Sequence, residues 1–475
     1  MSTAKRTRGS GKSSAGSEVK VRYEDGLSRI SSHAAGIDVG SEEHWVCVPY
    51  SGGDAAERVR RFGALTCDLL AIRDWLKERG VTTVAMESTG VYWIALYQIL
   101  EEAGLDVWLV NARYIRRVPG RPKTDRLDCE WIQRLHSYGL MRRSFRPAND
   151  VCAIRSLWRY RDRLIDQWSR CVKQIQKALH EMNVLLHKAV SDITGKTGTA
   201  ILEAIVQGER NPVRLARFRD PRVKATESEL AEALRGDFRE ELVLIGASAL
   251  RHLRFTESEI ATLDAQIEQR MGGLQPRNTD IGEAELVSTD LRRNSHQHAP
   301  EFDAVHLVQR LYGVPLGDIP GLSATTLTGI LSEVGLDLSR WENAKHFTSW
   351  LSLSPTARIS GGRIIASART AGTANRAGRY FRQAASSLKH NDTPLGEFYR
   401  RMRSRNGTKH AIVSTARKLA EIFYTMVTTG ERYRYLDGSE YDQKLREMQI
   451  RNLQRRAAKL GMELKEAEPP QSRTA

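Results

Sequence analysis

Residues 34–40 read AAGIDVG and residues 82–90 read TTVAMESTG, and these two stretches decide the fold. Each is an apolar run interrupted by one acid, Asp38 or Glu87, shortly before a glycine. Such a run is typical of a buried strand that ends at a turn. Further strands are expected at 44–50, 58–65 and 106–111, and helices ending at glycine at 67–80, 91–104 and 125–139. The pattern predicts an α/β domain with early antiparallel strands and later strand–helix units.

Two more acids, Asp125 and Asp128, lie three residues apart at the predicted start of a helix, where Thr124 is the expected N-cap. This spacing places both carboxylates on one helical face. Each acid alone is typical of a turn, a cap or a solvated helix face. Four carboxylates brought close together repel one another unless a hard divalent cation neutralises them. We therefore expect a Mg²⁺ site formed by Asp38, Glu87, Asp125 and Asp128.

The composition favours a polyanionic partner. The 475 residues include 73 Lys and Arg against 57 Asp and Glu, a formal net charge of +16, and nucleic acid is the usual partner of such a chain. No stretch has the ~18 apolar residues of a membrane span and no signal peptide is visible, so we expect a cytoplasmic protein without a membrane partner. The five cysteines are scattered without a CxxC pair, which indicates reduced thiols.

The chain is too long for one ordinary core and predicts several domains. We expect a disordered basic arm at 1–30, the α/β domain at 31–148, long helices with an inserted segment at 149–272, a polar linker at 273–303, a mainly α-helical domain at 304–437 and a charged tail at 438–475.

The long helices have apolar residues at alternating steps of three and four, which is typical of a coiled coil. Leu164 and Ile175 belong to the first seam, in which Arg161 is the one polar residue, and Leu253 and Ile260 belong to the second. The two helices could pair with each other as an antiparallel hairpin or with another subunit. The segment between them, at 188–238, is expected to be irregular.

Basic residues gather beside the acids and in the C-terminal domain. A charge run is usually a solvated loop, but the loop that leads into the acidic helix suits contact with a phosphodiester. Residues 319–335 have the helix, Pro-Gly turn and helix of a helix-hairpin-helix, in which amides near Gly321 meet a phosphate. The residues expected to bind nucleic acid are Arg113, Arg116, Arg117, Arg121, Lys123, Arg358, Arg363, Arg369 and Arg376, with Gly321, Gly361 and Gly362 in phosphate-contact loops.

The order of the four acids, the long helices, the Pro-Gly motif and the string SPTARISGGR at 354–363 resembles the DEDD transposases of insertion sequences, the bridge-RNA-guided recombinases. The resemblance covers about residues 33–430. It implies a RuvC-like N-terminal domain with an RNase H fold, whose four acids are catalytic and bind Mg²⁺. It also implies a C-terminal transposase domain that supplies a serine nucleophile. By that match the catalytic serine is Ser360, which precedes Gly361-Gly362-Arg363.

The resemblance implies partners as well: DNA of the element ends and of the target, and a structured noncoding guide RNA that pairs with both. The host is then a bacterium or archaeon and the protein is nucleoid-associated. The chain departs from the family pattern at several positions. Ile359 replaces a first serine, Ser352 replaces a glycine, Arg363 replaces a lysine, and Thr370 stands where a lysine is common. The first departure removes a rival nucleophile.

We expect the serine hydroxyl to attack a DNA phosphodiester and form a phosphoserine, with metal ions relieving the developing charge. Ser360 and the acids lie in separate domains, so the site would be completed within one chain or between subunits of a dimer or tetramer. Two alternatives stay open. One is a metal-dependent endonuclease of the Holliday-junction-resolvase type, in which activated water attacks. The other is a nucleic-acid-binding protein without enzymatic activity.

Overall fold

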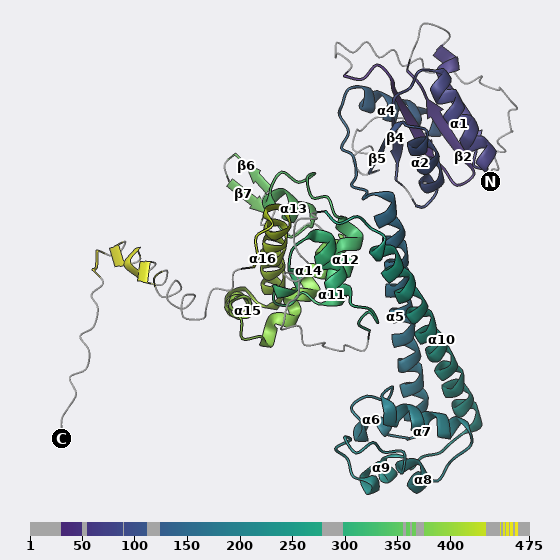
Figure 1. Cartoon of the computed structure of the whole chain (residues 1–475), viewed down its shortest axis with the longest axis vertical. Helices are drawn as coiled ribbons and strands as arrows, with labels where there is room; N and C mark the ends of the chain where they lie inside the picture. The colour runs from purple at the N-terminus through teal and green to yellow at the C-terminus, as the bar shows by residue number, and fades with distance from the viewer. Residues whose placement is uncertain are drawn as a thin grey trace, which may run out of the picture. The chain divides into compact units, whose positions relative to one another are not determined.

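The computed structural model describes residues 30–49, 55–88, 90–111, 124–277, 298–354, 358–361, 363–366 and 375–433, and scattered positions between 447 and 463. The chain divides into two compact units, Met1–Arg146 and Pro147–Ala475 (Figure 1). Of the described helices, none is long and apolar enough to cross a membrane.

The first unit is built on a five-stranded mixed sheet with the order β3-β2-β1-β4-β5. Its strands are β1 (Ala34–Val39), β2 (Glu43–Cys47), β3 (Val59–Gly63), β4 (Thr83–Glu87) and β5 (Asp106–Val110). β1, β2 and β3 pair antiparallel, whereas β4 and β5 extend the sheet in parallel with β1. This confirms the predicted α/β domain with early antiparallel strands, and it fits an RNase H-like domain.

Helices cover both faces of the sheet. They are η1 (Ala55–Arg58), α1 (Thr66–Glu78), α2 (Trp93–Glu102) and α4 (Asp125–Ser137). Side chains alternate between the faces of a strand, so Val84 and Met86 share one apolar core with α1 and α2. Ala85, between them, packs in another core with Ile132 of α4. The sheet is therefore sandwiched between α1 and α2 on one side and α4 on the other.

The second unit begins with two long helices, α5 (Asn149–Glu181) and α10 (Glu240–Gly272). They pack against each other (Figure 1). They run antiparallel, because Arg161 contacts Asp264 while Trp168, further along α5, contacts Glu257, earlier in α10. The predicted seam residues, such as Leu164 and Ile175, are buried. Of the two predicted pairings, the structure shows the hairpin within one chain.

The prediction of an irregular segment at 188–238 is wrong. The structure has α6 (Leu186–Ala189), α7 (Lys196–Val206), α8 (Pro212–Ala216) and α9 (Glu227–Ala233) there. Ile201, Leu215, Leu230 and Leu234 are fully buried in a core shared with α5 and α10. Three of the four helices are one or two turns long, too short to show an apolar period in the sequence. Their helicity depends on this shared core.

The C-terminal part is mainly helical, as predicted. Its elements are α11 (Ala304–Tyr312), η3 (Leu316–Asp318), α12 (Ala324–Val334), α13 (Ala344–Trp350), β6 (Arg358–Ser360), β7 (Arg363–Ala366), α14 (Arg376–Ser387), η4 (Leu388–His390), α15 (Pro394–Asn406) and α16 (Thr408–Thr429). Phe347, Phe381 and Phe423 are fully buried and their rings contact one another. This aromatic core holds α13, α14 and α16 together.

Candidate active site

Asp38 and Glu87 lie at the same edge of the sheet. β1 and β4 are parallel neighbours, and the register pairs Ile37 with Met86. The next residue of each strand is an acid, Asp38 or Glu87. Both side chains are half-buried. The carboxyl ends of parallel strands meet at one edge of a sheet, so the two carboxylates are neighbours where β1 and β4 end.

The helix that carries the other two acids runs antiparallel to β1. Near the C-terminal end of α4, the side-chain amide of Gln133 donates through Nε2 to the backbone carbonyl oxygen of Ala34 at 3.0 Å. His136 is hydrogen-bonded to the hydroxyl of Thr83 at 2.9 Å. Ala34 and Thr83 are the first residues of β1 and β4. The beginning of α4 therefore points to the opposite edge of the sheet, at which Asp38 and Glu87 lie.

A glycine makes this packing close. A Cβ placed on Gly36 of β1 would lie 2.2 Å from the backbone nitrogen of Gln133 and 2.6 Å from the carbonyl oxygen of Cys129. Only a residue without a side chain lets the backbone of α4 approach the strand in this way. Gly36 thus brings the helix that carries Asp125 and Asp128 against the strand that carries Asp38.

The first turn of α4 has the structure that the sequence predicts. The side chain of Thr124 caps the helix by accepting a hydrogen bond from the amide of Leu127 at 3.3 Å. Asp125 is exposed and Asp128 is half-buried. Carboxylates in a first turn interact favourably with the positive end of the helix dipole. Both acids are therefore presented from a capped, dipole-stabilised helix start.

A thiol pair that sequence reasoning missed lies beneath the acids. Cys47 of β2 and Cys129 of α4 are both fully buried, and Arg58 donates to the sulfur of Cys47 at 3.4 Å and to Gln133 at 3.3 Å. The hydrogen bond between the thiols lowers the pKa of Cys47. The same bond, burial and nearby acids including Asp38 raise the pKa of Cys129. Asp38 is thus within electrostatic reach of the residue that follows Asp128.

The four acids gather at one edge but do not close into a ligand cage. Within the part of the chain that the structure describes, no three His, Cys, Asp or Glu side chains are grouped closely enough to hold a metal ion. The donor set consists only of carboxylate oxygens, which is the chemistry that Mg²⁺ prefers. Asp38 and Glu87 come from strand ends, and Asp125 and Asp128 come from the capped end of α4. The chemistry of these residues fits a hard cation, although in this structure their side chains are not close enough together to enclose one.

Ser360 is the last residue of β6, at the tip of a short hairpin. It pairs with Arg363 of β7 across a two-residue turn. Gly361 in this turn has φ +56, is exposed, and has no atom within 4 Å of the position that a Cβ would take. A positive φ and open space favour glycine here. The hairpin leaves room above its turn, as the approach of a phosphate backbone requires.

The remaining predicted contacts are described unevenly. Arg376 is exposed in the first turn of α14. For Arg358 and Arg363 the structure describes only the backbone. The predicted contacts Arg113, Arg116, Arg117, Arg121, Lys123, Gly362 and Arg369 lie outside the described residues.

Gly321 has a packing reason of its own. It has φ +89, and a Cβ placed there would lie 2.8 Å from the carbonyl oxygen of Ala384. The Pro-Gly turn therefore packs on the end of α14. This contact accounts for the glycine without a phosphate, so its predicted role in phosphate binding stays a prediction.

The helix that follows the serine hairpin is anchored to α5. Trp158 donates its indole N–H to the hydroxyl of Tyr380 at 3.0 Å, and that hydroxyl donates to Asp162 at 3.0 Å. Arg379, next to Tyr380 on α14, also pairs with Asp162. Gly329 of α12 leaves space for the ring of Tyr380, because a Cβ there would lie 2.4 Å from it. These contacts fix α14 to the long helix.

Comparisons with protein families match both ends of this arrangement. Residues 35–184 match the model of the DEDD transposases of the IS110 type, described as a transposase. Residues 315–400 match the model described as the transposase IS116/IS110/IS902 family. The chain belongs to the DEDD transposases. A search of curated proteins found no match.

The two matches include every predicted catalytic residue of this DEDD transposase. Asp38, Glu87, Asp125 and Asp128 fall in the first match and Ser360 falls in the second. The helices between α5 and α10 fall in neither. Membership of these families indicates that the chain acts in transposition, which cuts and rejoins DNA.

Proposed function

We propose that this transposase cuts and rejoins strands of an insertion sequence and its target through a phosphoserine intermediate formed on Ser360, guided by a structured noncoding RNA. The proposal rests on two structural features, each of which lies within one of the two family matches. One is the edge of the sheet at which Asp38, Glu87, Asp125 and Asp128 gather. The other is the open Gly361 turn that directly follows Ser360.

The chemistry divides between the two elements. A serine hydroxyl is a weak nucleophile, so its attack on a phosphodiester needs removal of its proton and relief of negative charge on the phosphate. Mg²⁺ bound by the four acids would supply this relief as a Lewis acid. The acids would hold it through oxygen ligands from two strand ends and one helix start. Attack by Ser360 forms one P–O bond as another breaks, and the leaving strand end keeps a hydroxyl.

The acids and the serine lie in different compact units, so we propose that a complete site forms only in an assembly, a dimer or a tetramer. The apolar faces of α5 and α10 are buried against each other. Contacts between subunits would therefore use the outer faces of these helices or other elements. Leu164 and Ile175 are almost fully buried. Lysine at these positions would therefore weaken the fold first. The coiled-coil geometry of this pair and the helix-hairpin-helix at 319–335 also stay predictions.

RNA is the proposed source of specificity. The net charge of +16 suits two nucleic acids, and no zinc-finger or recognition-helix signature is visible in the sequence. Base pairing by a guide RNA would read the DNA, and the protein would bind backbone and helix shape. Recombination should then stop when RNase is present throughout. Recombination at the correct sites by RNase-treated, RNA-free protein would remove the RNA from the proposal.

The serine is tested by trapping the covalent intermediate. Wild-type protein on a nicked suicide substrate should yield a protein–DNA adduct that mass spectrometry maps to Ser360. Ser360→Ala should bind DNA and lose the adduct, while Ser386→Ala, at an exposed position of α14, is the matched control. An adduct on Ser352, Ser354 or Ser367 would move the nucleophile within the loop. Cleavage without any adduct would favour the water-attack endonuclease.

The acids are tested by isosteric changes. Asp38→Asn and Glu87→Gln should abolish cleavage while leaving the melting temperature within a few degrees, because each removes a ligand charge but no core packing. Asp74→Asn, at an exposed position of α1, is the control with the same change in charge. Excess EDTA should reproduce the loss in wild-type protein. Full activity of either variant, or in EDTA, would refute the metal site.

A further inference from the structure

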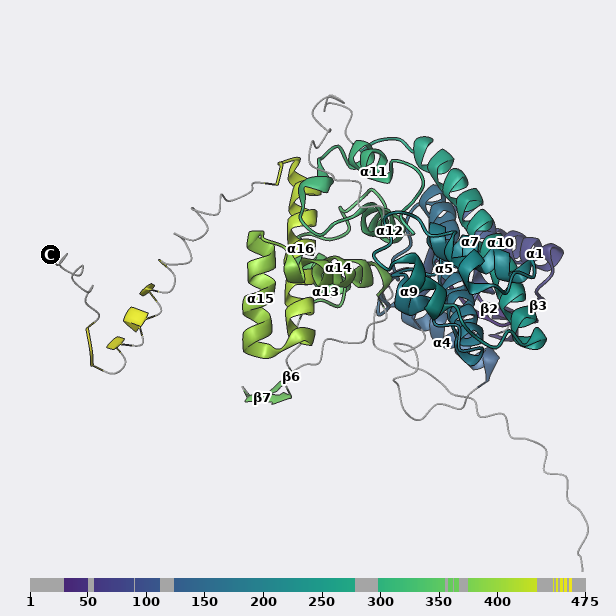
Figure 2. The same ribbon diagram turned by 90° about the horizontal axis from the view of Figure 1, so that it is seen from below.

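The corner between α15 and α16 carries a dense cluster of positive charge. Between residues 400 and 418 the chain has seven Lys and Arg and no Asp or Glu. α15 ends at Asn406 and α16 begins at Thr408, with Gly407 (φ +79) as the only residue between them. The two helices lie side by side (Figure 2). We call Arg401, Arg403, Arg405, Lys409 and His410 the basic corner.

Part of this charge is used within the protein. Arg400, just before the corner, donates to the carbonyl oxygen of Asn391 at 2.8 Å. Arg417 forms an ion pair with Glu421 at 2.9 Å. Arg401 lies over the ring of Phe398 at 5.6 Å from its centroid, within the distance of a cation–π contact. These residues have structural partners that explain them.

Three side chains of the corner have no such partner among the described residues. Arg403, Arg405 and Lys409 are exposed, and within the described residues their side chains form no hydrogen bond or ion pair. Arginines in the last turn of α15 complement its dipole, which alone would account for Arg403 and Arg405. Lys409 is in the first turn of α16, where a positive charge opposes the dipole and no acid offsets it. Helix stability therefore does not explain the cluster as a whole.

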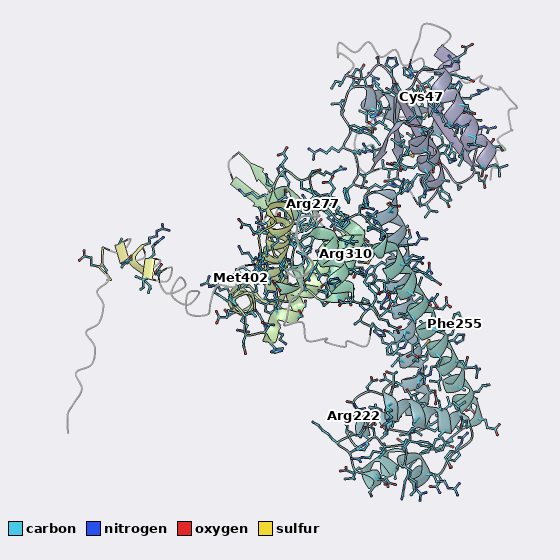
Figure 3. The ribbon with its side chains drawn as sticks, in the orientation of Figure 1. Cys47, Arg222, Phe255, Arg277, Arg310 and Met402 are labelled. Carbon is cyan, nitrogen blue, oxygen red and sulfur yellow. The ribbon has the colours of Figure 1, made fainter. Side chains whose placement is uncertain are left out.

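The corner has the properties of a phosphate-binding surface without base recognition. Its cations are on α15 and α16, which pack against each other, and Arg403, Arg405 and Lys409 are exposed rather than buried. Such residues contact phosphates and read no base edges. No Phe, Tyr or Trp of α15 or α16 is exposed, and the one exposed ring of the corner is the imidazole of His410, so the corner offers little surface on which unpaired bases stack. Figure 3 labels Met402, which lies on α15 within the cluster and is half-buried.

We propose that the basic corner binds the phosphate backbone of duplex DNA beside the strand that Ser360 attacks. The choice of DNA rests on the proposed function, because the corner belongs to the same C-terminal part of the chain as the serine hairpin. With His410 as its one exposed ring, the corner suits a duplex better than the loops of a guide RNA, whose unpaired bases stack on several aromatic side chains. Three free cations correspond to two or three phosphate contacts on one face of the duplex.

The test compares two variants with the same change in charge. Arg403→Ala/Arg405→Ala/Lys409→Ala removes the corner. Arg170→Ala/Lys173→Ala/Arg251→Ala removes three exposed cations of α5 and α10 and is the control. Fluorescence anisotropy measures binding of a 30-base-pair DNA duplex of arbitrary sequence in EDTA, over a range of KCl concentrations. Thermal unfolding should be the same for both variants and the wild type.

Each phosphate contact contributes about 0.9 to the slope of log K against log[salt]. The corner variant should therefore have a slope smaller by about 2 to 3, and the control should keep the wild-type slope to within about 0.5. Equal slopes for all three proteins would overturn the proposal. The same titration with an RNA duplex and an RNA hairpin decides the partner, since a change confined to RNA would replace DNA by the guide.

The outcome is independent of the chemistry proposed for Ser360. Trapping on the nicked substrate reports the serine, and the salt slope in EDTA reports the corner. A wild-type protein without an adduct but with the expected slopes would refute the phosphoserine and keep the corner. A normal Ser360 adduct, together with equal salt slopes for the wild type and the corner variant, would keep the phosphoserine and refute the role of the corner.

Discussion

Replacing Arg161 by methionine should destabilise the second unit far more than removing an ordinary surface charge. Arg161 and Asp264 are each 1% exposed and form a two-pronged ion pair between α5 and α10, with one of its hydrogen bonds at 2.9 Å. After the change, the one hydrogen bond that Asp264 keeps among the described residues is from the amide of Glu301, at 3.2 Å. Leaving one member of a buried pair uncompensated costs about 3–5 kcal/mol.

The double variant Arg161→Met/Asp264→Leu should recover most of that loss. Replacing both charges by apolar side chains of similar size is often neutral or stabilising. Here it also breaks two bonds to the backbone, from Arg161 to the carbonyl oxygen of His298 and from the amide of Glu301 to Asp264. At about 1 kcal/mol for each of these bonds, we expect a net loss of about 0–2 kcal/mol for the double variant.

Urea unfolding measures both variants. Trp158 and Trp168 lie close to the pair, Trp158 under the guanidinium of Arg161 at 5.0 Å, so tryptophan fluorescence follows this region. Arg161→Met, Asp264→Leu and the double variant form a double-mutant cycle, in which we expect a coupling free energy of at least about 2 kcal/mol between the two side chains. A loss below about 1 kcal/mol for Arg161→Met would refute the reasoning. So would a double variant that is no more stable than the single one.

Three other changes test the packing and the titration of the fold by thermal unfolding. Gly36→Val should cost at least about 2 kcal/mol and stop cleavage, because its side chain meets the backbone of α4. Gly246→Ala is the control: this half-buried glycine of α10 has room for a Cβ, whose nearest neighbour would be the Cβ of Ala178 at 4.0 Å, so the change should be neutral or stabilising by up to about 1 kcal/mol. Equal effects of the two changes would contradict the close approach at Gly36. Ser352→Gly should stabilise by about 1 kcal/mol, since Ser352 has φ +57 where the family pattern has glycine, and a loss would refute strain. Burial lowers the pKa of His136 to about 4, so as the pH falls the unfolded protein takes up this proton before the folded protein does. The free energy of unfolding should therefore fall by up to about 3 kcal/mol between pH 6.5 and 4. His136→Gln should flatten this pH dependence, and an unchanged slope would exclude His136 as its cause.

Ser352 stands where the family pattern has glycine, and the structure shows the backbone consequence of this replacement. It follows the end of α13, where its amide donates to the carbonyl oxygen of Ser349 at 3.0 Å and the amide of Leu353 donates to that of Thr348 at 3.0 Å. These two bonds define a Schellman motif, which places its residue after the cap in the left-handed region. The sequence shows that a glycine is replaced. The motif shows that the replacement costs backbone strain just before the serine hairpin.

The strands and helices of the first unit were predictable because their signals are local. Asp38 and Glu87 end apolar runs, and Thr124 precedes a first turn with two acids; each of these features is complete within a few residues. The insert between α5 and α10 was not predictable in this way. Its short helices, such as α8 (Pro212–Ala216), are stabilised by a core that includes residues more than 30 positions away, so no local period reports them.

The polar contacts across the second unit were equally hidden. Arg161 breaks an apolar seam in the sequence, and nothing nearby identifies its partner, 103 residues away. The same holds for Asp162, which binds Tyr380 and Arg379 of α14. These pairs form only after the chain has folded back on itself, so a single sequence contains no record of them. The contacts of Asp162 nevertheless hold α14, the helix that follows the serine hairpin.

The gathering of the four acids follows from one close contact. The strand register alone makes neighbours of Asp38 and Glu87, but it does not determine the position of α4, which begins at Asp125, 38 residues after Glu87. The absence of a side chain at Gly36 lets the backbone of α4 lie directly on β1, and the bonds from Gln133 and His136 set its direction. With the opposite direction, Asp125 and Asp128 would lie at the other edge of the sheet. The placement of the carboxylates therefore depends on Gly36, Gln133 and His136, none of which is a predicted metal ligand.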